Sequence, residues 1–230
     1  MPVASESEHF RFHYEPGDSI DAARTEAHCA WATARLGVTL PRKIDYYKYS
    51  SRQQMGQYTG HDDANAFSVP EQFELHTLWS WDNHESVHIY SSLLGRPSDF
   101  FNEGLAVAFQ TDPLAGQYDS VFNGLPVHEW ARQRLRDGTL LSLDGMVVSE
   151  DFRSVADSTS SYREAGSFLR YLLDTHGIAP LADFMRRSTR DDSRDVIKSH
   201  FSEAFALPLS ESESRWHVFL QNLPTPTPQP

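Results

Sequence analysis

Residues 84–106 read HESVHIYSSLLGRPSDFFNEGLA and predict two consecutive helices joined by a tight turn. The first helix is expected over residues 81–94 and ends where the Gly-Arg-Pro sequence at 95–97 interrupts the helical pattern. Ser98 can cap the second helix, which we expect over roughly residues 99–110. The turn allows the second helix to fold back against the first, and this pair is the centre of the expected fold.

The first of these helices contains the pattern His-Glu-x-x-His at residues 84–88. Positions four apart stack on one face of a helix, so the imidazoles of His84 and His88 can reach the same metal ion. Glu85 lies beside the first histidine, where its carboxylate can accept a proton from water that the metal activates. Imidazole ligands suit zinc, so the pattern predicts a Zn²⁺ site.

A catalytic zinc usually has three protein ligands and an open fourth position, so a third ligand is needed. In one group of zinc enzymes a glycine and a further histidine follow the pattern, but those positions are Ser91 and Leu94 here. The remaining good candidate is Glu103, and Gly104 after it leaves room for two helices to approach closely. If Glu103 is not the ligand, Asp99 or Asp112 must be reconsidered.

Together the segments HESVH and FFNEGLA resemble the two motifs of the gluzincin metallopeptidases, in particular the compact peptidase-MA-like bacterial families with N-E-G-x-A as second motif. The sequence SYREAGSFLRYLLDTHG resembles the family's helix after the active site. VIKSHFSEAFALPLSESESRWHVFL resembles its terminal pair of helices. The resemblance therefore covers roughly residues 60–221.

This resemblance implies a zinc-dependent peptidase that hydrolyses peptide bonds with metal-activated water. It assigns His84, His88 and Glu103 as the zinc ligands and Glu85 as the general base. The G-x-M-E-N signature of aminopeptidases is absent upstream, which favours an endopeptidase. The expected partner is a peptide or protein substrate.

The chain departs from thermolysin-like enzymes at Val107, where they often carry an aspartate that supports a ligand histidine. Metal-bound histidines normally donate their other N–H to a carboxylate or carbonyl group. Asp99 could accept such a bond, although a solvated acid at the start of a helix is the favoured interpretation of this residue.

Peptide hydrolysis places negative charge on the carbonyl oxygen, and a Tyr or His donor usually helps to stabilise it. Tyr162 is the preferred candidate, because the resemblance places a tyrosine there, at a helix start after a polar loop over residues 157–161. Packing against neighbouring apolar residues is the alternative for Tyr162. His128 and His176 are weaker candidates for the donor.

The N-terminal part predicts a strand-rich lobe. Strands are expected over residues 9–15, 43–49, 66–69 and 73–79, with a helix over 19–36 that ends at Gly37 and a short helix over 51–58. The stretch Ala64–Val69 can be an edge strand that pairs with an extended peptide, although an ordinary strand is equally compatible with the pattern. The histidines outside the motif, including His13 and His76, are expected near the surface.

From about residue 80 the pattern becomes helical. Beyond the two helices of the motif, helices are expected over residues 126–136, 161–175, 179–187, 192–205 and 210–221. The order predicts an α+β, zincin-like domain over residues 1–221, in which a strand-rich lobe (about 9–80) and a helical lobe (81–221) flank an active-site cleft. Residues 222–230 are expected to form a proline-rich tail.

Composition excludes several classes of protein. The net charge of −12 argues against nucleic acid as a partner and mildly favours neutral or basic peptides. No apolar run is long enough to span a membrane. Cys29 is the only cysteine and is expected to be a small half-buried residue rather than a reactive thiol. The protein is expected in the cytoplasm if Met1 is native, and outside it if a signal peptide was removed.

Two other classes of protein remain open. A metal-binding peptide-recognition module of the same fold would keep the site without cleaving peptides in the cell, although the intact Glu85 argues against it. A helical scaffold with a chance motif would bind no metal.

Overall fold

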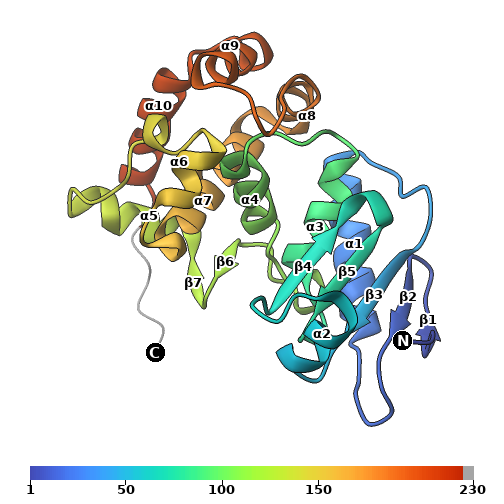
Figure 1. Cartoon of the computed structure of the whole chain (residues 1–230). Helices are drawn as coiled ribbons and strands as arrows, with labels where there is room; N and C mark the ends of the chain where they lie inside the picture. The colour runs from blue at the N-terminus through green and yellow to red at the C-terminus, as the bar shows by residue number, and fades with distance from the viewer. Residues whose placement is uncertain (225–230) are drawn as a thin grey trace. The chain divides into compact units, whose positions relative to one another are not determined.

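The computed structural model describes residues 1–224 and divides them into two compact units (Figure 1). The first unit comprises Met1–Gly95 and Phe109–Asp119, and the second comprises Arg96–Ala108 and the chain from Ser120 onward. The HESVH segment therefore belongs to the first unit and the NEG segment to the second. Gly95 joins them with φ = 150°, a backbone conformation that side chains disfavour.

A five-stranded mixed sheet organises the first unit, in the order β1-β2-β3-β5-β4. The strands are β1 (Ser5–Glu6), β2 (Phe10–His13), β3 (Ile44–Lys48), β4 (Ala66–Val69) and β5 (Glu74–Thr77). β2, β3 and β5 run parallel, whereas β1 and β4 are antiparallel to their neighbours. β4 lies at one edge of the sheet, as the sequence suggested.

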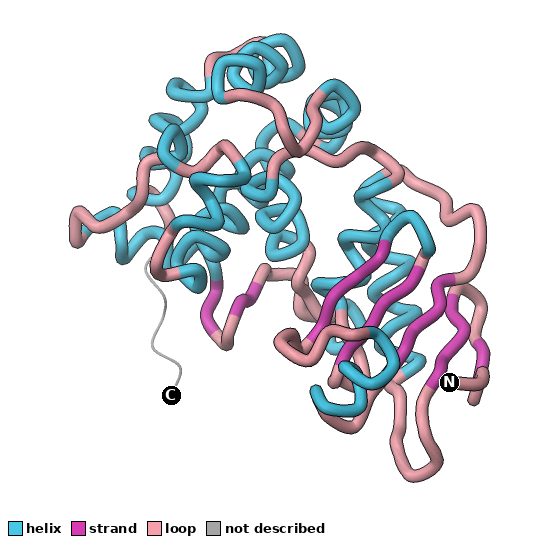
Figure 2. The backbone as a smooth tube through the Cα atoms, viewed as in Figure 1, coloured by secondary structure: helices cyan, strands magenta, loops and turns pink. Residues whose placement is uncertain are grey.

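Alternation along the strands gives the sheet one apolar face. Its fully buried residues are Phe10, Phe12, Ile44, Tyr46 and Leu75. Helices α1 (Ala22–Leu36) and α3 (Asn83–Ser92) pack together and cover this face, as Figures 1 and 2 show. The short helix α2 (Arg52–Thr59) begins after Ser51, whose hydroxyl accepts the N–H of Gln54. The packing of α1 and α3 on the apolar face fixes α3 against the sheet.

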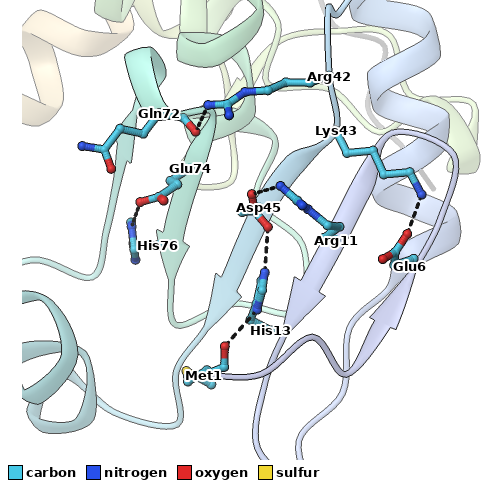
Figure 3. A network of polar contacts seen from close by, with 10 residues as sticks. All are labelled: Met1, Glu6, Arg11, His13, Arg42, Lys43, Asp45, Gln72, Glu74 and His76. Atoms are coloured by element: carbon cyan, nitrogen blue, oxygen red, sulfur yellow. Dashed lines mark hydrogen bonds and ion pairs between the residues drawn. The ribbon is translucent and has the colours of Figure 1, made fainter.

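The opposite face of the sheet carries polar side chains, among them His13, Asp45 and His76 (Figure 3), together with a row of stacked rings. His13, Tyr47, His76 and Phe67 are cross-strand neighbours, and their rings stack in succession with centroids 4.2, 4.8 and 4.6 Å apart. His13 and His76 are buried by this stacking, so their expected surface position was wrong. Asp45 binds His13 and Arg11 on the same face, at 2.8 and 2.5 Å.

The second unit is helical. Its helices are α4 (Asp99–Ala108), α5 (Val127–Arg136), α6 (Ser149–Ser154), α7 (Ser158–His176), α8 (Ile178–Arg187), α9 (Arg194–Phe205) and α10 (Leu209–Gln221). A short 3-10 turn (Leu143–Gly145) and a small hairpin of β6 (Val121–Phe122) and β7 (Leu125–Pro126) complete it. α4 and α7 form the most extensive pairing, around which the other helices pack. This pairing positions Glu103 and Tyr162.

Gly104 and Gly166 allow the close approach of α4 and α7. A Cβ atom on Gly104 would lie 2.9 Å from the carbonyl oxygen of Ala165, and one on Gly166 would lie 2.2 Å from Cγ1 of Val107. The sequence led us to expect that Gly104 allows the two helices of the motif to approach each other, whereas the close contact that the structure shows at Gly104 is with α7. Val107 is fully buried against Gly166, which accounts for an apolar residue at the position where thermolysin-like enzymes carry an acid.

The expected mixture of helices and strands is confirmed, and the predicted elements occur close to their expected positions. The strand β1, the helix α6 and the β6–β7 hairpin were not predicted. The two units do not coincide with residues 9–80 and 81–221, because α3 packs with the sheet and the 109–119 segment belongs to the first unit. Within residues 1–224 no helix is long and apolar enough to cross a membrane. The expected tail at 222–230 lies mostly outside the described residues.

Candidate metal site and an acid-arginine pocket

The start of α3 is fixed by buried polar contacts. Asp82 precedes the helix, and its Oδ1 accepts the N–H of Glu85 at 3.1 Å while its Oδ2 accepts the hydroxyl of Thr77 at 2.8 Å. The side chain of Asn83 donates to the carbonyl of Thr111 at 2.6 Å. The motif helix is therefore anchored both to the end of β5 and to the 109–119 segment.

His84, Glu85 and His88 lie together on the first turns of α3. One potential ligand atom from each of the three side chains lies within 4.8 Å of the others. The two imidazole rings are 5.0 Å apart between centroids and nearly perpendicular, at 82°. His88 is buried, whereas His84 and Glu85 are half-buried. This arrangement can hold a divalent metal ion with nitrogen ligands and leave it accessible from outside.

Gln110 is a functional candidate that the sequence did not reveal. Its Oε1 lies 3.3 Å from Nδ1 of His84, which places an acceptor on one side of the ring. Such a contact favours the tautomer with the proton on Nδ1 and leaves Nε2 as the metal-binding atom. The sequence gives little indication of this contact, because Gln110 lies several residues after the second motif. It comes close to His84 only because the 109–119 segment belongs to the first unit.

Asp82 is the second residue that the sequence did not reveal. Its burial, followed by the nearby charge of Glu85, raises the pKa of Asp82 to about 6. An Asp-x-x-Glu spacing at a helix start was available as a capping signal at residues 82–85. Because Asp82 holds the backbone N–H of Glu85, its protonation would weaken the hydrogen bond that anchors the start of the motif helix.

A pocket of about 300 Å³ in the second unit brings Glu103 and Tyr162 together. It is lined by Asp99, Glu103, Phe152, Arg153, Ser158, Tyr162 and Arg190. These residues come from α4, α6, α7 and the loop after α8, so the pocket depends on the tertiary packing of segments far apart in the sequence. Two residues that the sequence proposed for different roles thus line one cavity.

Asp99 is not a solvated acid, contrary to the favoured expectation. It is buried, and its carboxylate binds the guanidinium groups of Arg153 and Arg190. The hydroxyl of Ser98 does not cap α4 as expected, because it donates to the carbonyl of Val147 at 2.5 Å. Ser149 instead accepts the N–H of Asp99 at 3.0 Å. The start of α4 is therefore fixed by α6 and its neighbours.

Asp112 is also engaged in the protein. Its carboxylate binds the guanidinium of Arg24 at 2.5 Å and accepts the N–H of Ala115 at 3.3 Å. Asp112 is buried in the first unit, where these contacts connect the 109–119 segment to α1. The buried carboxylate thus has a structural partner, which accounts for this acid without a metal.

Tyr162 lies one turn inside α7 rather than at its start. The expected loop over 157–161 is helical from Ser158, and Asp157 caps it by accepting the N–H of Ser160 at 3.2 Å. The ring of Tyr162 stacks between those of Phe122 and Phe152, with centroids 5.8 and 5.4 Å away. Tyr162 thus combines ring packing with a place in the pocket wall.

His128 and His176 occupy other surroundings. Nδ1 of His128 forms a hydrogen bond of 2.8 Å with the hydroxyl of Ser167, and its ring contacts Phe219. The ring of His176 contacts Phe205 at the end of α7. The pocket wall in residues 1–224 includes neither histidine.

Cys29 is fully buried, deeper than expected, and its burial raises the pKa of the thiol to about 12. The neutral thiol is a poor nucleophile, in agreement with the expected structural role. Cys29 forms a second cluster with His9 and Glu26, whose Nδ1 and Oε2 atoms are 2.7 Å apart.

Comparison with known proteins adds no assignment. No protein-family model, no curated protein and no solved structure matches the chain. The functional argument therefore depends on the residues and their surroundings.

Proposed function

We propose that the protein is a zinc-dependent peptidase of the gluzincin kind, with a zincin-like fold, and that it acts as an endopeptidase. The observation that carries the proposal is the convergence of His84, Glu85 and His88 on α3, with ligand atoms within 4.8 Å of one another. Zinc ligands in proteins are about 2.0–2.3 Å from the ion, so side chains at this separation can converge on one ion with small adjustments. The donor set therefore fits zinc.

In this proposal His84 and His88 bind the ion through imidazole nitrogen. Gln110 holds His84 in the tautomer that binds metal. Glu103 provides the third ligand, an assignment that follows from the N-E-G motif and its resemblance to the gluzincin family. When bound, zinc would polarise the scissile carbonyl and lower the pKa of a water molecule.

Glu85 acts as the general base. Its carboxylate accepts a proton from the attacking water and delivers it to the leaving amine. A base has to lie close to that water, and Glu85 lies beside both histidines, as this role requires. The hydroxyl of Tyr162 donates a hydrogen bond to the carbonyl oxygen of the substrate as negative charge develops there. Its place with Glu103 in one pocket supports this assignment.

The alternative function is a metal-binding peptide-recognition module. The same edge strand β4 can pair with an extended peptide in either case, because its outer edge presents backbone groups. A module that only binds peptide has no need of a carboxylate beside the two histidines. The position of Glu85 therefore favours the peptidase.

Two measurements test the proposal. Elemental analysis of protein purified without chelator should find about one zinc per chain. A peptide library should be cleaved by the wild-type protein and spared after chelation. Glu85→Gln should keep zinc and the fold but lose activity by several orders of magnitude, because an amide cannot accept the proton.

Glu150→Gln is the matched control, since Glu150 is an exposed acid on α6. It should leave cleavage unchanged. Zinc binding without cleavage would favour the recognition module. Failure to bind any transition metal, even on titration, would exclude both functions.

A further inference from the structure

Two arginines in the pocket share one buried acid. Nε and Nη2 of Arg190 lie 2.9 and 3.3 Å from the two carboxylate oxygens of Asp99, and Arg153 binds the same carboxylate through Nε. The side chain of Asp99 is only 11% exposed, whereas those of Arg153 and Arg190 are 53% and 58% exposed. Asp99 thus fixes the inner edges of two guanidinium groups whose outer edges are accessible.

The outer edges retain hydrogen-bond donors. Within the described residues, the contacts of Arg190 leave Nη1 unused, and those of Arg153 leave both Nη atoms unused. Guanidinium groups present donors in a fixed fork that matches the geometry of a carboxylate. Ser158 and Tyr162 belong to the same pocket wall. The pocket therefore offers several donors to an anionic group.

The charge balance of the pocket depends on the state of Glu103. Two guanidinium groups face two carboxylates, those of Asp99 and Glu103, and Glu103 is near enough to help to raise the pKa of Arg190. If Glu103 binds zinc, as the proposed function requires, its charge is shared with the ion and counts less against an anion in the pocket. Asp191 is not part of the pocket wall, but its charge raises the pKa of Arg190 more than the charge of Glu103 does.

We propose that Arg153 and Arg190 form a subsite for a carboxylate group of the peptide substrate. This inference rests on the proposed peptidase function for the nature of the ligand. The net charge of −12 opposes the approach of any acidic peptide, so a preference for carboxylates must come from local contacts. The subsite reverses the expectation from composition that neutral or basic peptides are favoured.

The carboxylate can have two sources. The side chain of an aspartate or glutamate would make the protein an endopeptidase that selects acidic residues. The C-terminal carboxylate of the substrate would make it an enzyme that acts near chain ends. Both groups have the same planar geometry, so matched peptides must separate them.

Binding to zinc-loaded Glu85→Gln protein provides the test, because this variant should not consume the peptide. Three pools of alanine-based octapeptides are compared by calorimetry. The first is neutral with both ends blocked, the second has one aspartate at varied positions with both ends blocked, and the third is neutral with a free C-terminus. We expect one of the last two pools to bind at least about tenfold more tightly than the first, which corresponds to about 1.4 kcal/mol.

Variants then locate the effect. Arg190→Gln and Arg153→Gln should abolish the preference for carboxylate, whereas Arg186→Gln should retain it, since Arg186 is an exposed arginine of α8 outside the pocket wall. Because loss of an arginine leaves the buried Asp99 less compensated, melting temperature is measured for each variant. Arg190→Lys provides a second test, since it keeps the charge beside Asp99 but loses the fork.

Arg190→Lys should remain folded and lose most of the preference. Equal binding of all three pools, or a preference that survives both Gln variants, would overturn the subsite. If the wild-type protein cleaves neutral blocked peptides but shows no carboxylate preference, the subsite fails and the peptidase function stands. If an arginine-dependent preference is measured without any cleavage, the subsite stands and the peptidase function fails.

Discussion

Replacement of Gly166 by alanine should destabilise the second unit, although alanine usually stabilises a helix. Gly166 lies inside α7, where a glycine costs about 1 kcal/mol relative to alanine. The added Cβ would lie 2.2 Å from Cγ1 and 2.7 Å from Cβ of Val107. Carbon atoms in contact normally stand about 3.5–4.0 Å apart, so rotation of Val107 alone cannot relieve the overlap with its Cβ.

The magnitude follows from these two opposing effects. Overpacking a core typically costs about 1–3 kcal/mol, and the deep overlap indicates the upper end of that range. Subtracting about 1 kcal/mol for the gain in helix propensity leaves a net loss of about 2 kcal/mol in the free energy of unfolding. Because α4 carries Glu103 and α7 carries Tyr162, separation of these helices should also widen the pocket and weaken any function that depends on it.

Chemical denaturation monitored by circular dichroism measures this loss. Gly145→Ala is the matched control, because Gly145 is exposed and an added Cβ there meets no atom within 4 Å. It should change stability by less than about 0.5 kcal/mol. In the Val107→Ala background the overlap with Cγ1 is gone but the overlap with Cβ remains, so Gly166→Ala should cost less than it does alone and still destabilise the protein. A Gly166→Ala protein as stable as the wild type would refute the description of this helix contact.

Three further predictions follow from the sites. Glu103→Ala should lose most of its zinc affinity while it remains folded, as measured by competition with a chromogenic chelator; unchanged affinity would place the third ligand elsewhere. Tyr162→Phe should lower kcat by a factor that corresponds to roughly 2.7–4 kcal/mol, with zinc content and melting temperature almost unchanged; an unaltered kcat would remove the hydroxyl from the mechanism. Burial lowers the pKa of His28 and of His76 from 6.5 to about 4 in the folded protein. Each neutral histidine therefore contributes at most about 3 kcal/mol to the free energy of unfolding. This contribution is complete above pH 6.5 and is lost as the pH falls toward 4. Melting temperature against pH should show this decline, and His76→Gln should make it shallower; an equally steep decline in that variant would contradict the role of His76.

The elements of the fold were largely predictable because their signals are local. Ser51 before α2 and Gly37 after α1 marked helix ends that the structure retains. Alternation predicted β2 and β3, since their inward side chains are aromatic or branched. The strand β1 was missed because it has only two residues, Ser5 and Glu6, and neither is apolar. Helix α6 was missed for a related reason, because its six residues are too short for a helical period to emerge.

The surroundings of the candidate site were less predictable, because they depend on contacts between distant segments. The spacing within HESVH predicts that two imidazoles and one carboxylate lie together. Gln110 could not be predicted in this way, because it lies 26 positions from His84 in the sequence. The sequence favours a solvated acid at Asp99, because its partners Arg153 and Arg190 lie 54 and 91 positions away. Charged residues that pair over such distances leave no periodic pattern, so composition suggests exposure where the fold produces burial.

The interleaved order of the two units has a consequence for synthesis of the chain. Residues 1–95 emerge from the ribosome well before Phe109–Asp119, yet that later segment contributes the carbonyl of Phe109 to His28, that of Thr111 to Asn83 and the carboxylate of Asp112 to Arg24. The sheet and its helices therefore lack these contacts until α4 has also been made. A fragment that stops at Gly95 would carry HESVH intact but leave His28 and Asn83 without these partners. Nascent chains of increasing length should accordingly acquire protease resistance in this unit only after residue 119 has left the exit tunnel.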